Sequence, residues 1–137
     1  MTKDYIGVKK VTAWPQIGKD GREGYAVKYE DGYTSWSPKD AFERAYFPIA
    51  NEGRISQEDV ESFMGTISDN KIDSKTTHVR AELLTGFVQH EVSSCVRPEN
   101  YDHEIGVSCA KNRIEDRVWA MLGFVLQWAE FGLRAEK

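Results

Sequence analysis

The sequence of 137 residues is short enough for one domain, or for one domain with a small appended module. Its hydrophobic fraction of 40%, charged fraction of 29% and 12% aromatic residues are those of a folded protein and exclude a chain that is disordered throughout. The net charge of −4 argues against a protein that coats DNA, because contacts with phosphates supply most of the affinity of such proteins and require an excess of positive charge.

The first third of the sequence is predicted to form a small antiparallel β-rich module. Four short segments rich in aromatic and β-branched residues are expected to be strands: 5–8, 11–14, 25–29 and 33–36. The dipeptide Asp31-Gly32 between the last two is typical of a hairpin turn. Ser37 is a suitable N-cap and Pro38 a suitable first helical residue, so a helix is predicted over residues 38–46.

A second short helix is predicted after Ser56, because a Ser followed three residues later by the acidic Asp59 is a typical helix start. The stretch 68–75 that follows is polar and is predicted to be a linker. We therefore expect an N-terminal module of residues 1–67 and a C-terminal unit of residues 76–137.

A β-hairpin is predicted for residues 76–95, with Thr85-Gly86 as a two-residue loop. Such a loop places Leu84 opposite Phe87 and fixes every other cross-strand pair. One face of the hairpin is then apolar and directed to the core, and the other face is polar. Leu84 and Phe87 are the apolar exceptions on the polar face.

A metal site is not expected. In this register His78 and His90 lie on opposite faces of the hairpin, so they cannot share a metal ion within one chain. Cys95 and Cys109 are not part of a CxxC motif. We expect both as free thiols in a reducing cytoplasm, because two cysteines are few for a disulfide scaffold and the N-terminal residues lack the apolar segment of a secretion signal.

A long helix is predicted over residues 103–133, with Asp102 as its cap. After Val118 apolar residues occupy every side of this helix, and a helix that is apolar all round has to be buried all round. We expect the missing cover to come from another copy of the chain. The run is shorter than the ~20 apolar residues of a membrane-spanning helix. The expected class is thus α+β, with a small antiparallel β-rich N-terminal module, then a β-hairpin and a long C-terminal helix used in oligomerisation.

Arg113 and Arg117 lie one turn apart on this helix, a spacing at which like charges destabilise an isolated helix by about 0.2–0.5 kcal/mol. Asp116 offsets part of that repulsion. The pair is either a clamp for a phosphorylated ligand, since guanidinium groups donate paired hydrogen bonds to phosphate, or a solvated helix face. The spacing alone favours the solvated face.

Three other residues suit a ligand site without requiring one. Phe87 is either a stacking platform for a base or a hydrophobic plug, and its position does not separate the two. Trp14 is more typical of a core or an interface than of a ligand platform. Arg97 is a cation that fits either a phosphate contact or plain surface.

No nucleophile elbow, Walker loop, dinucleotide fingerprint or HExxH motif occurs in the sequence. Its carboxylates are grouped no more closely than in any acidic chain. We therefore expect a protein that binds a ligand, not an enzyme, and we expect no cofactor.

Two long stretches of the sequence resemble phage proteins. The first consists of YIGVKKVTAWP and GYAVKYEDGYTSWSPKDAFERAY. The second consists of TGFVQHEVSSCVRPENYDHEIG and KNRIEDRVWAMLGFVLQ, and it resembles the Gp49-like family of small phage proteins. Together, in this order, the two stretches resemble the first-described Thoeris anti-defence proteins of phages, over nearly the whole chain.

This resemblance implies a sponge protein that acts in the cytoplasm of the infected bacterium. Members of that family bind the glycocyclic ADP-ribose signals made by TIR-domain proteins, do not cleave them, and so prevent activation of the Thoeris effector. They form dimers or higher oligomers, hexamers included, with ligand pockets at subunit interfaces. Some also trap cyclic di- or trinucleotides of the CBASS system. Long nucleic acid, membranes and metals are not implied as partners.

The resemblance also assigns roles to residues. It implies that Arg113 and Arg117 neutralise the diphosphate of the signal and that Phe87 stacks on its adenine. The other residues expected at the ligand are Asn112, Asp116, Asn100, Trp14, Arg97 and Tyr101. Other members carry an acid or a small polar residue where Arg97 stands, which leaves the role of that position open.

Two further functions stay open. One is a phage enzyme that degrades the same signal, against which only the missing catalytic motifs argue. The other is a structural or regulatory phage protein without a small ligand, against which the paired helical arginines and the strand aromatic argue together.

Overall fold

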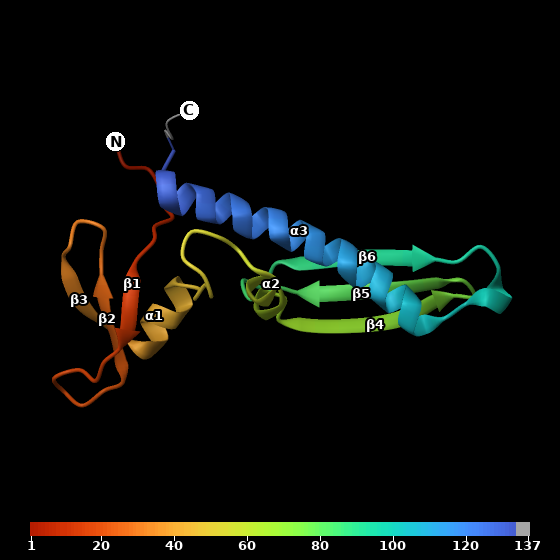
Figure 1. Ribbon diagram of the computed structural model, residues 1–137, viewed down its shortest axis with the longest axis horizontal. Helices are drawn as coiled ribbons and strands as arrows, with labels where there is room; N and C mark the ends of the chain where they lie inside the picture. Colours follow the sequence, from red (N-terminus) through yellow and green to blue (C-terminus); the bar gives the residue numbers. More distant parts are fainter. Residues whose placement is uncertain (134–137) are drawn as a thin grey trace. The chain divides into compact units, whose positions relative to one another are not determined.

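The computed structural model describes residues 1–133 of the chain, which fold into two compact units (Figure 1). Of the described residues, the first unit comprises 1–49 and 125–133, and the second comprises 50–124. The elements of the first unit are β1 (Thr12–Pro15), β2 (Gly24–Lys28), β3 (Thr34–Pro38) and α1 (Lys39–Ala45). Those of the second are α2 (Gln57–Phe63), β4 (Thr66–Asp73), β5 (Thr76–Glu82), β6 (Val88–Ser94) and η1 (Pro98–Asn100). The helix α3 (His103–Phe131) contributes to both units, and the predicted α+β class is confirmed.

The first unit is a three-stranded antiparallel sheet in the order β1-β2-β3, on which α1 packs (Figure 1). The central strand β2 carries the buried residues Ala26 and Val27. On α1, the ring of Phe42 lies between Tyr25 and Tyr46, with ring centroids 4.4 and 4.8 Å away. Stacked aromatic rings thus fix α1 against the sheet.

Two predictions about this unit are wrong. The segment 5–8 is not a strand, since the pairing of β1 with β2 begins only at Thr12. Ser37 does not cap α1, because it stays in β3 opposite Tyr25. Pro38 takes the N-cap position and makes no side-chain cap bond.

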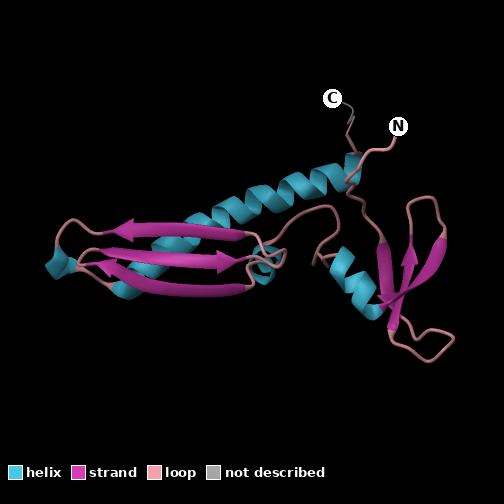
Figure 2. Cartoon of the chain, turned by 180° about the vertical axis from the view of Figure 1, so that it is seen from behind, coloured by secondary structure: helices cyan, strands magenta, loops and turns pink. Residues whose placement is uncertain are grey.

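The second unit is built on a three-stranded antiparallel sheet in the order β4-β5-β6, with α3 across one face (Figure 2). The segment 68–75, predicted as a linker, instead forms most of β4, so that prediction is wrong. All residues of β4 are exposed, so the strand lacks the alternation of buried and exposed residues by which strands are recognised in a sequence. Backbone pairing with β5, from Thr66 opposite Glu82 to Asp73 opposite Thr76, makes it a strand.

The start of α2 follows the prediction. The Ser56 hydroxyl accepts from the Asp59 N–H, and the Asp59 carboxylate accepts from the Ser56 N–H at 2.9 Å, which completes a capping box. The same carboxylate, only 2% exposed, also accepts from the Ala50 N–H at 2.9 Å. Val60 on the helix and Met64 at its C-cap are buried.

The hairpin of β5 and β6 has a register different from the predicted one. The Leu83 N–H donates to the Phe87 carbonyl, and the Gly86 N–H donates to the Leu83 carbonyl, so the loop has three residues, 84–86. Gly86 has a φ of 87°, the left-handed conformation that the last residue of such a loop requires. Each cross-strand pair is therefore shifted by one residue.

The shift exchanges the two faces of β6. Gln89 and Glu91 lie on the side that faces α3, together with the buried Val79 of β5. His90 lies on the open side with His78, and Nε2 of His78 is 2.8 Å from Nδ1 of His90. The expectation that these two histidines occupy opposite faces is wrong.

The packing of α3 on β5 begins in its first turn. The Asp102 carboxylate accepts from the Ile105 N–H at 3.2 Å, as predicted for the cap. A Cβ on Gly106 would overlap the hydroxyl of the buried Thr77, so the helix backbone approaches the strand as closely as glycine allows. The buried residues of α3 recur at helical spacing: Ala110, Ile114, Val118 and Leu122.

The far side of α3 stays exposed within the single chain. Trp119, Phe124 and Phe131 are 37%, 70% and 59% exposed. Burial by another copy of the chain stays a prediction. In the described part of the chain, residues 1–133, no helix is both long and apolar enough to cross a membrane.

Candidate anion-binding site

Arg117 reaches from α3 to the edge strand β6 and is held there by three hydrogen bonds. Its Nε donates to Oε1 of Gln89 at 2.9 Å, and its Nη1 donates to Oε2 of Glu91 at 2.7 Å. Its Nη2 donates to the His90 carbonyl at 2.9 Å. The guanidinium group is therefore fixed in one orientation before any ligand arrives.

Arg113, one turn earlier on α3, reaches the same strand. Its Nη1 donates to the Val92 carbonyl at 2.7 Å and lies 3.9 Å from Oε1 of Glu91. Two guanidinium groups thus converge on one carboxylate. Their mutual repulsion is offset by Glu91, which the sequence did not assign to this cluster.

The electrostatics of the cluster keep Glu91 ionised. The hydrogen bond from Arg117 lowers the pKa of Glu91 below its ordinary value of 4.5, and the bond from the Val92 N–H and the charge of Arg113 act in the same direction. The side chains of Arg113 and Arg117 are 54% and 38% exposed, whereas that of Glu91 is 21% exposed. A ligand in solvent therefore meets the arginines before the carboxylate.

Phe87 lies at the start of the same strand. Because side chains alternate along a strand, it extends towards the same side as Gln89 and Glu91. Its side chain is 61% exposed, and that of the neighbouring Leu84 at the tip of the hairpin is 56% exposed, so both are largely open to solvent. Phe87 therefore offers an open aromatic face beside the arginine cluster. Asn112 and Asp116 are exposed on α3 next to the two arginines.

Three other predicted residues lie at the opposite end of the sheet. The Tyr101 hydroxyl is 2.7 Å from the Thr77 hydroxyl. Asn100 is the last residue of the adjacent turn η1, and Arg97 is its N-cap. Phe87 lies opposite Leu83, which is six residues after Thr77 in the chain. At the rise of a strand, six residues separate Phe87 from the Thr77 end of the sheet by about 20 Å. One chain therefore does not bring Tyr101, Asn100 and Arg97 to the ligand that Phe87 would contact. Trp14 lies on β1, in the other unit.

Gln89 and Glu91 are absent from the predicted site residues because the predicted register places them on the wrong face of the hairpin. A usable signal was present: Leu84-Thr85-Gly86, with glycine last, fits a three-residue hairpin loop that ends in a left-handed residue. With that loop, Glu91 faces α3 and becomes an obvious partner for helix arginines.

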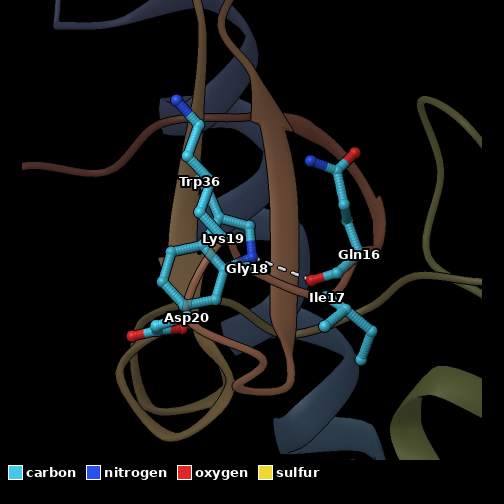
Figure 3. A pocket seen from close by; sticks show the side chains of 6 residues that line it. All are labelled: Gln16, Ile17, Gly18, Lys19, Asp20 and Trp36. Carbon is cyan, nitrogen blue, oxygen red and sulfur yellow. Dashed lines mark hydrogen bonds between the residues drawn. The ribbon is translucent and has the colours of Figure 1, made fainter.

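Two hollows in the surface of the first unit contain none of the predicted ligand residues. One, of about 330 Å³, is lined by Trp36 and the turn 16–20 (Figure 3). The Trp36 Nε1–H donates to the Gln16 carbonyl at 2.8 Å, and the indole ring packs so closely on Gly18 that a Cβ there would clash. Trp36 therefore stabilises the turn 16–20 and has a structural role.

Among residues 1–133, no group of three or more His, Cys, Asp or Glu side chains is placed to hold a metal ion. The chemistry that the site offers is recognition of an anion by arginine beside an exposed aromatic ring.

The fold and the site define a small α+β protein with an arginine-rich strand edge. Comparison with protein-family models gives a match over residues 43–129 to the phage protein (N4 Gp49/phage Sf6 gene 66) family. The chain therefore belongs to this family of phage proteins. Neither the curated proteins nor the solved structures yield a match.

Proposed function

We propose that this phage protein is an anti-defence sponge that binds a cyclic ADP-ribose-type immune signal, glycocyclic ADP-ribose, and withholds it from the Thoeris effector without cleaving it. It would act in the cytoplasm of the infected bacterium. The resemblance to the Thoeris anti-defence proteins suggests this ligand, and membership of a phage protein family is consistent with it.

The observation that carries the proposal is the convergence of Arg113 and Arg117 on a single carboxylate beside the exposed ring of Phe87. A position that attracts one anionic group between two guanidinium groups also suits a diphosphate. The ligand's diphosphate would take the place of the Glu91 carboxylate. Its adenine would stack on Phe87, and the exposed Asn112 and Asp116 are close enough along α3 to bond its hydroxyls.

The binding free energy that such a site can supply is sufficient for a sponge. To suppress a signal at micromolar concentration requires a Kd of about 1 nM, or roughly −12 kcal/mol. Hydrogen bonds to charged groups contribute about 1.5–3 kcal/mol each, and base stacking on an aromatic residue contributes about 1–3 kcal/mol. Three or four such bonds and one stacked base reach this range when the groups are fixed beforehand, as Arg117 is.

The distance between the two ends of the β4-β5-β6 sheet supports an oligomer in which two copies of the chain share a ligand. Tyr101, Asn100 and Arg97 lie about 20 Å from Phe87 within one chain. They would contact the same ligand only if a second copy supplied them, and a dimer or higher oligomer with interfacial pockets meets this condition. A separate site for cyclic di- or trinucleotides of CBASS is part of the same proposal.

The test is binding of glycocyclic ADP-ribose to four variants, measured by calorimetry. Arg113→Ala and Phe87→Ala are expected to abolish binding while the variants stay folded. Arg80→Ala, an arginine on the open face of the same sheet, and Leu84→Ala, the apolar neighbour of Phe87, are the matched controls and are expected to bind normally. Undiminished binding in Arg113→Ala and Phe87→Ala would contradict the site.

The enzyme alternative shares the ligand and differs in its fate. A hydrolase converts the signal, whereas a sponge returns it intact. A structural phage protein without a small ligand predicts no binding in any variant.

A further inference from the structure

The two edges of the C-terminal sheet are protected to different degrees. Along β6, side chains bond the backbone groups that point away from β5. The Val88 carbonyl accepts from Gln89 Nε2 at 3.1 Å. The carbonyls of His90 and Val92 accept from the two arginines of α3, at 2.9 and 2.7 Å. The edge of β6 is therefore closed to another strand.

The other edge, β4, has no such cover. Residues of an antiparallel pair alternate between bonding their neighbour and pointing away from it. The Leu83 N–H bonds the Phe87 carbonyl, so the backbone N–H and C=O groups of the odd-numbered residues of β5 point towards β6. Those of the even-numbered residues point towards β4. Even-numbered residues of β5 pair with even-numbered residues of β4, from Thr66 to Asn70. The outward backbone groups of β4 are therefore those of Ile67, Asp69 and Lys71.

This open edge is long and exposed to solvent. β4 has eight residues, all exposed, and its regular pairing with β5 continues to Lys71, where a bulge interrupts it. Three consecutive outward-facing residues offer three N–H donors and three carbonyl acceptors in one row. Such a row of unpaired backbone groups is a template for another strand.

We infer that β4 pairs antiparallel with β4 of a second copy of this chain, so that two three-stranded sheets become one of six strands. The two copies are related by a two-fold axis perpendicular to the sheet, which passes beside Asn70. This is an isologous contact, in which the same surface serves both copies. The inference does not depend on the ligand proposed above.

The charges of β4 identify the second copy as the partner. Within one chain the Asp69 carboxylate lies 2.7 Å from Nε2 of His103, and the Lys71 ammonium group lies 4.4 Å from the centroid of the Tyr101 ring, so both side chains are on the face of the sheet that carries α3. With Asn70 on the axis, Asp69 of each copy lies opposite Lys71 of the other copy on this face, and both residues have outward-facing backbone groups. Opposite charges at directly opposed positions stabilise a strand pair, and like charges destabilise it. A shift of the axis by one residue, to Asp69 or to Lys71, places like charges opposite each other. The sequence Asp69-Asn70-Lys71 is thus complementary to itself in one register.

The first test is the mass and the hydrogen exchange of the full chain. Sedimentation is expected to show a dimer or a multiple of it. Amide exchange followed by NMR is expected to show protection of the Asp69 and Lys71 N–H groups that increases with protein concentration. Ser68 and Asn70 are the internal controls, because their N–H groups bond β5 in either state. A monomer at all concentrations, or an oligomer with the Asp69 and Lys71 N–H groups unprotected, overturns the inference.

The second test is charge reversal. Lys71→Glu turns two opposite-charge pairs into two like-charge pairs across the axis, and is expected to raise the Kd of the dimer about tenfold. The double variant Asp69→Lys with Lys71→Glu restores complementarity and is expected to restore the dimer. Lys75→Glu, the same change of charge in the turn after β4, is the control and is expected to dimerise normally. Equal effects of Lys71→Glu and Lys75→Glu would contradict the proposed register.

Discussion

Oε2 of Glu91 on the edge strand β6 lies 2.7 Å from Nη1 of Arg117 on α3, although the two residues are 26 positions apart in the sequence. The carboxylate occupies the position between two arginines where the proposed diphosphate would bind. In the free protein Glu91 is the counter-ion of the arginines, and under the proposed function it would compete with the ligand.

The first prediction concerns this competition. Glu91→Gln keeps a hydrogen-bond acceptor for Arg117 and removes the negative charge, so the affinity for an anionic ligand is expected to increase about tenfold, or roughly 1.4 kcal/mol. Calorimetry with ADP-ribose and with glycocyclic ADP-ribose measures it. Glu82→Gln, an exposed acid beside Arg80 on the open face, is the matched control and leaves affinity unchanged. Weaker binding by Glu91→Gln would mean that the carboxylate orients the arginines more than it competes with the ligand.

The second prediction concerns pH. The pKa of Glu91 in the folded protein lies below its ordinary value of 4.5, so between these two values the unfolded chain binds more protons than the folded one. The stability that this contact contributes is therefore complete above about pH 4.5 and is lost as the pH falls through the folded-state pKa. Urea unfolding of the wild type and of Glu91→Gln between pH 2 and 7 checks this. Their difference in the free energy of unfolding should shrink on the acid side, and a difference independent of pH would contradict the account.

The third prediction uses two glycines of α3. Gly106→Ala places a Cβ against the buried Thr77 hydroxyl, and is expected to destabilise the protein by about 1–3 kcal/mol through overpacking. Gly123→Ala meets nothing within 4 Å and is expected to stabilise it by up to about 1 kcal/mol, because alanine favours the helix. Chemical denaturation of both variants measures the two effects. A stability of Gly106→Ala equal to or above that of the wild type would show that α3 does not approach β5 as closely as described.

The fourth prediction concerns the start of α2. Ser56→Ala removes one cap bond and is expected to cost about 1 kcal/mol. Asp59→Ala is expected to cost more, about 2–4 kcal/mol, because it leaves the Ala50 and Ser56 N–H groups without their acceptor in a half-buried place. Thermal unfolding ranks the two variants, and a larger loss in Ser56→Ala would contradict the assigned bonds.

Local features of this chain could be predicted from its sequence. The capping box of Ser56 and Asp59 and the cap at Asp102 involve residues three apart, so local sequence determines them. The long helix follows from its apolar spacing over many turns. The strand β4 could not be found in this way, because all its residues are exposed and only pairing with β5 makes it a strand.

The candidate site was predictable in part. Arg113 and Arg117 share a helix face whatever the tertiary structure is, so their proximity could be anticipated. Their partner Glu91 could not, since a loop of three residues in place of two moves it to the other face of the sheet. A shift of the register by one residue thus decides whether Glu91 is exposed on the open face or lies between the two arginines.

The most direct measurement of the central claim is a release assay. The purified protein is incubated with glycocyclic ADP-ribose and filtered free of unbound ligand, and the retained fraction is heated and analysed by mass spectrometry. The account predicts intact ligand in stoichiometric amount from the wild type, and none from Arg113→Ala. Release of a cleaved product would show an enzyme, and retention of nothing would show that this family member does not bind the signal.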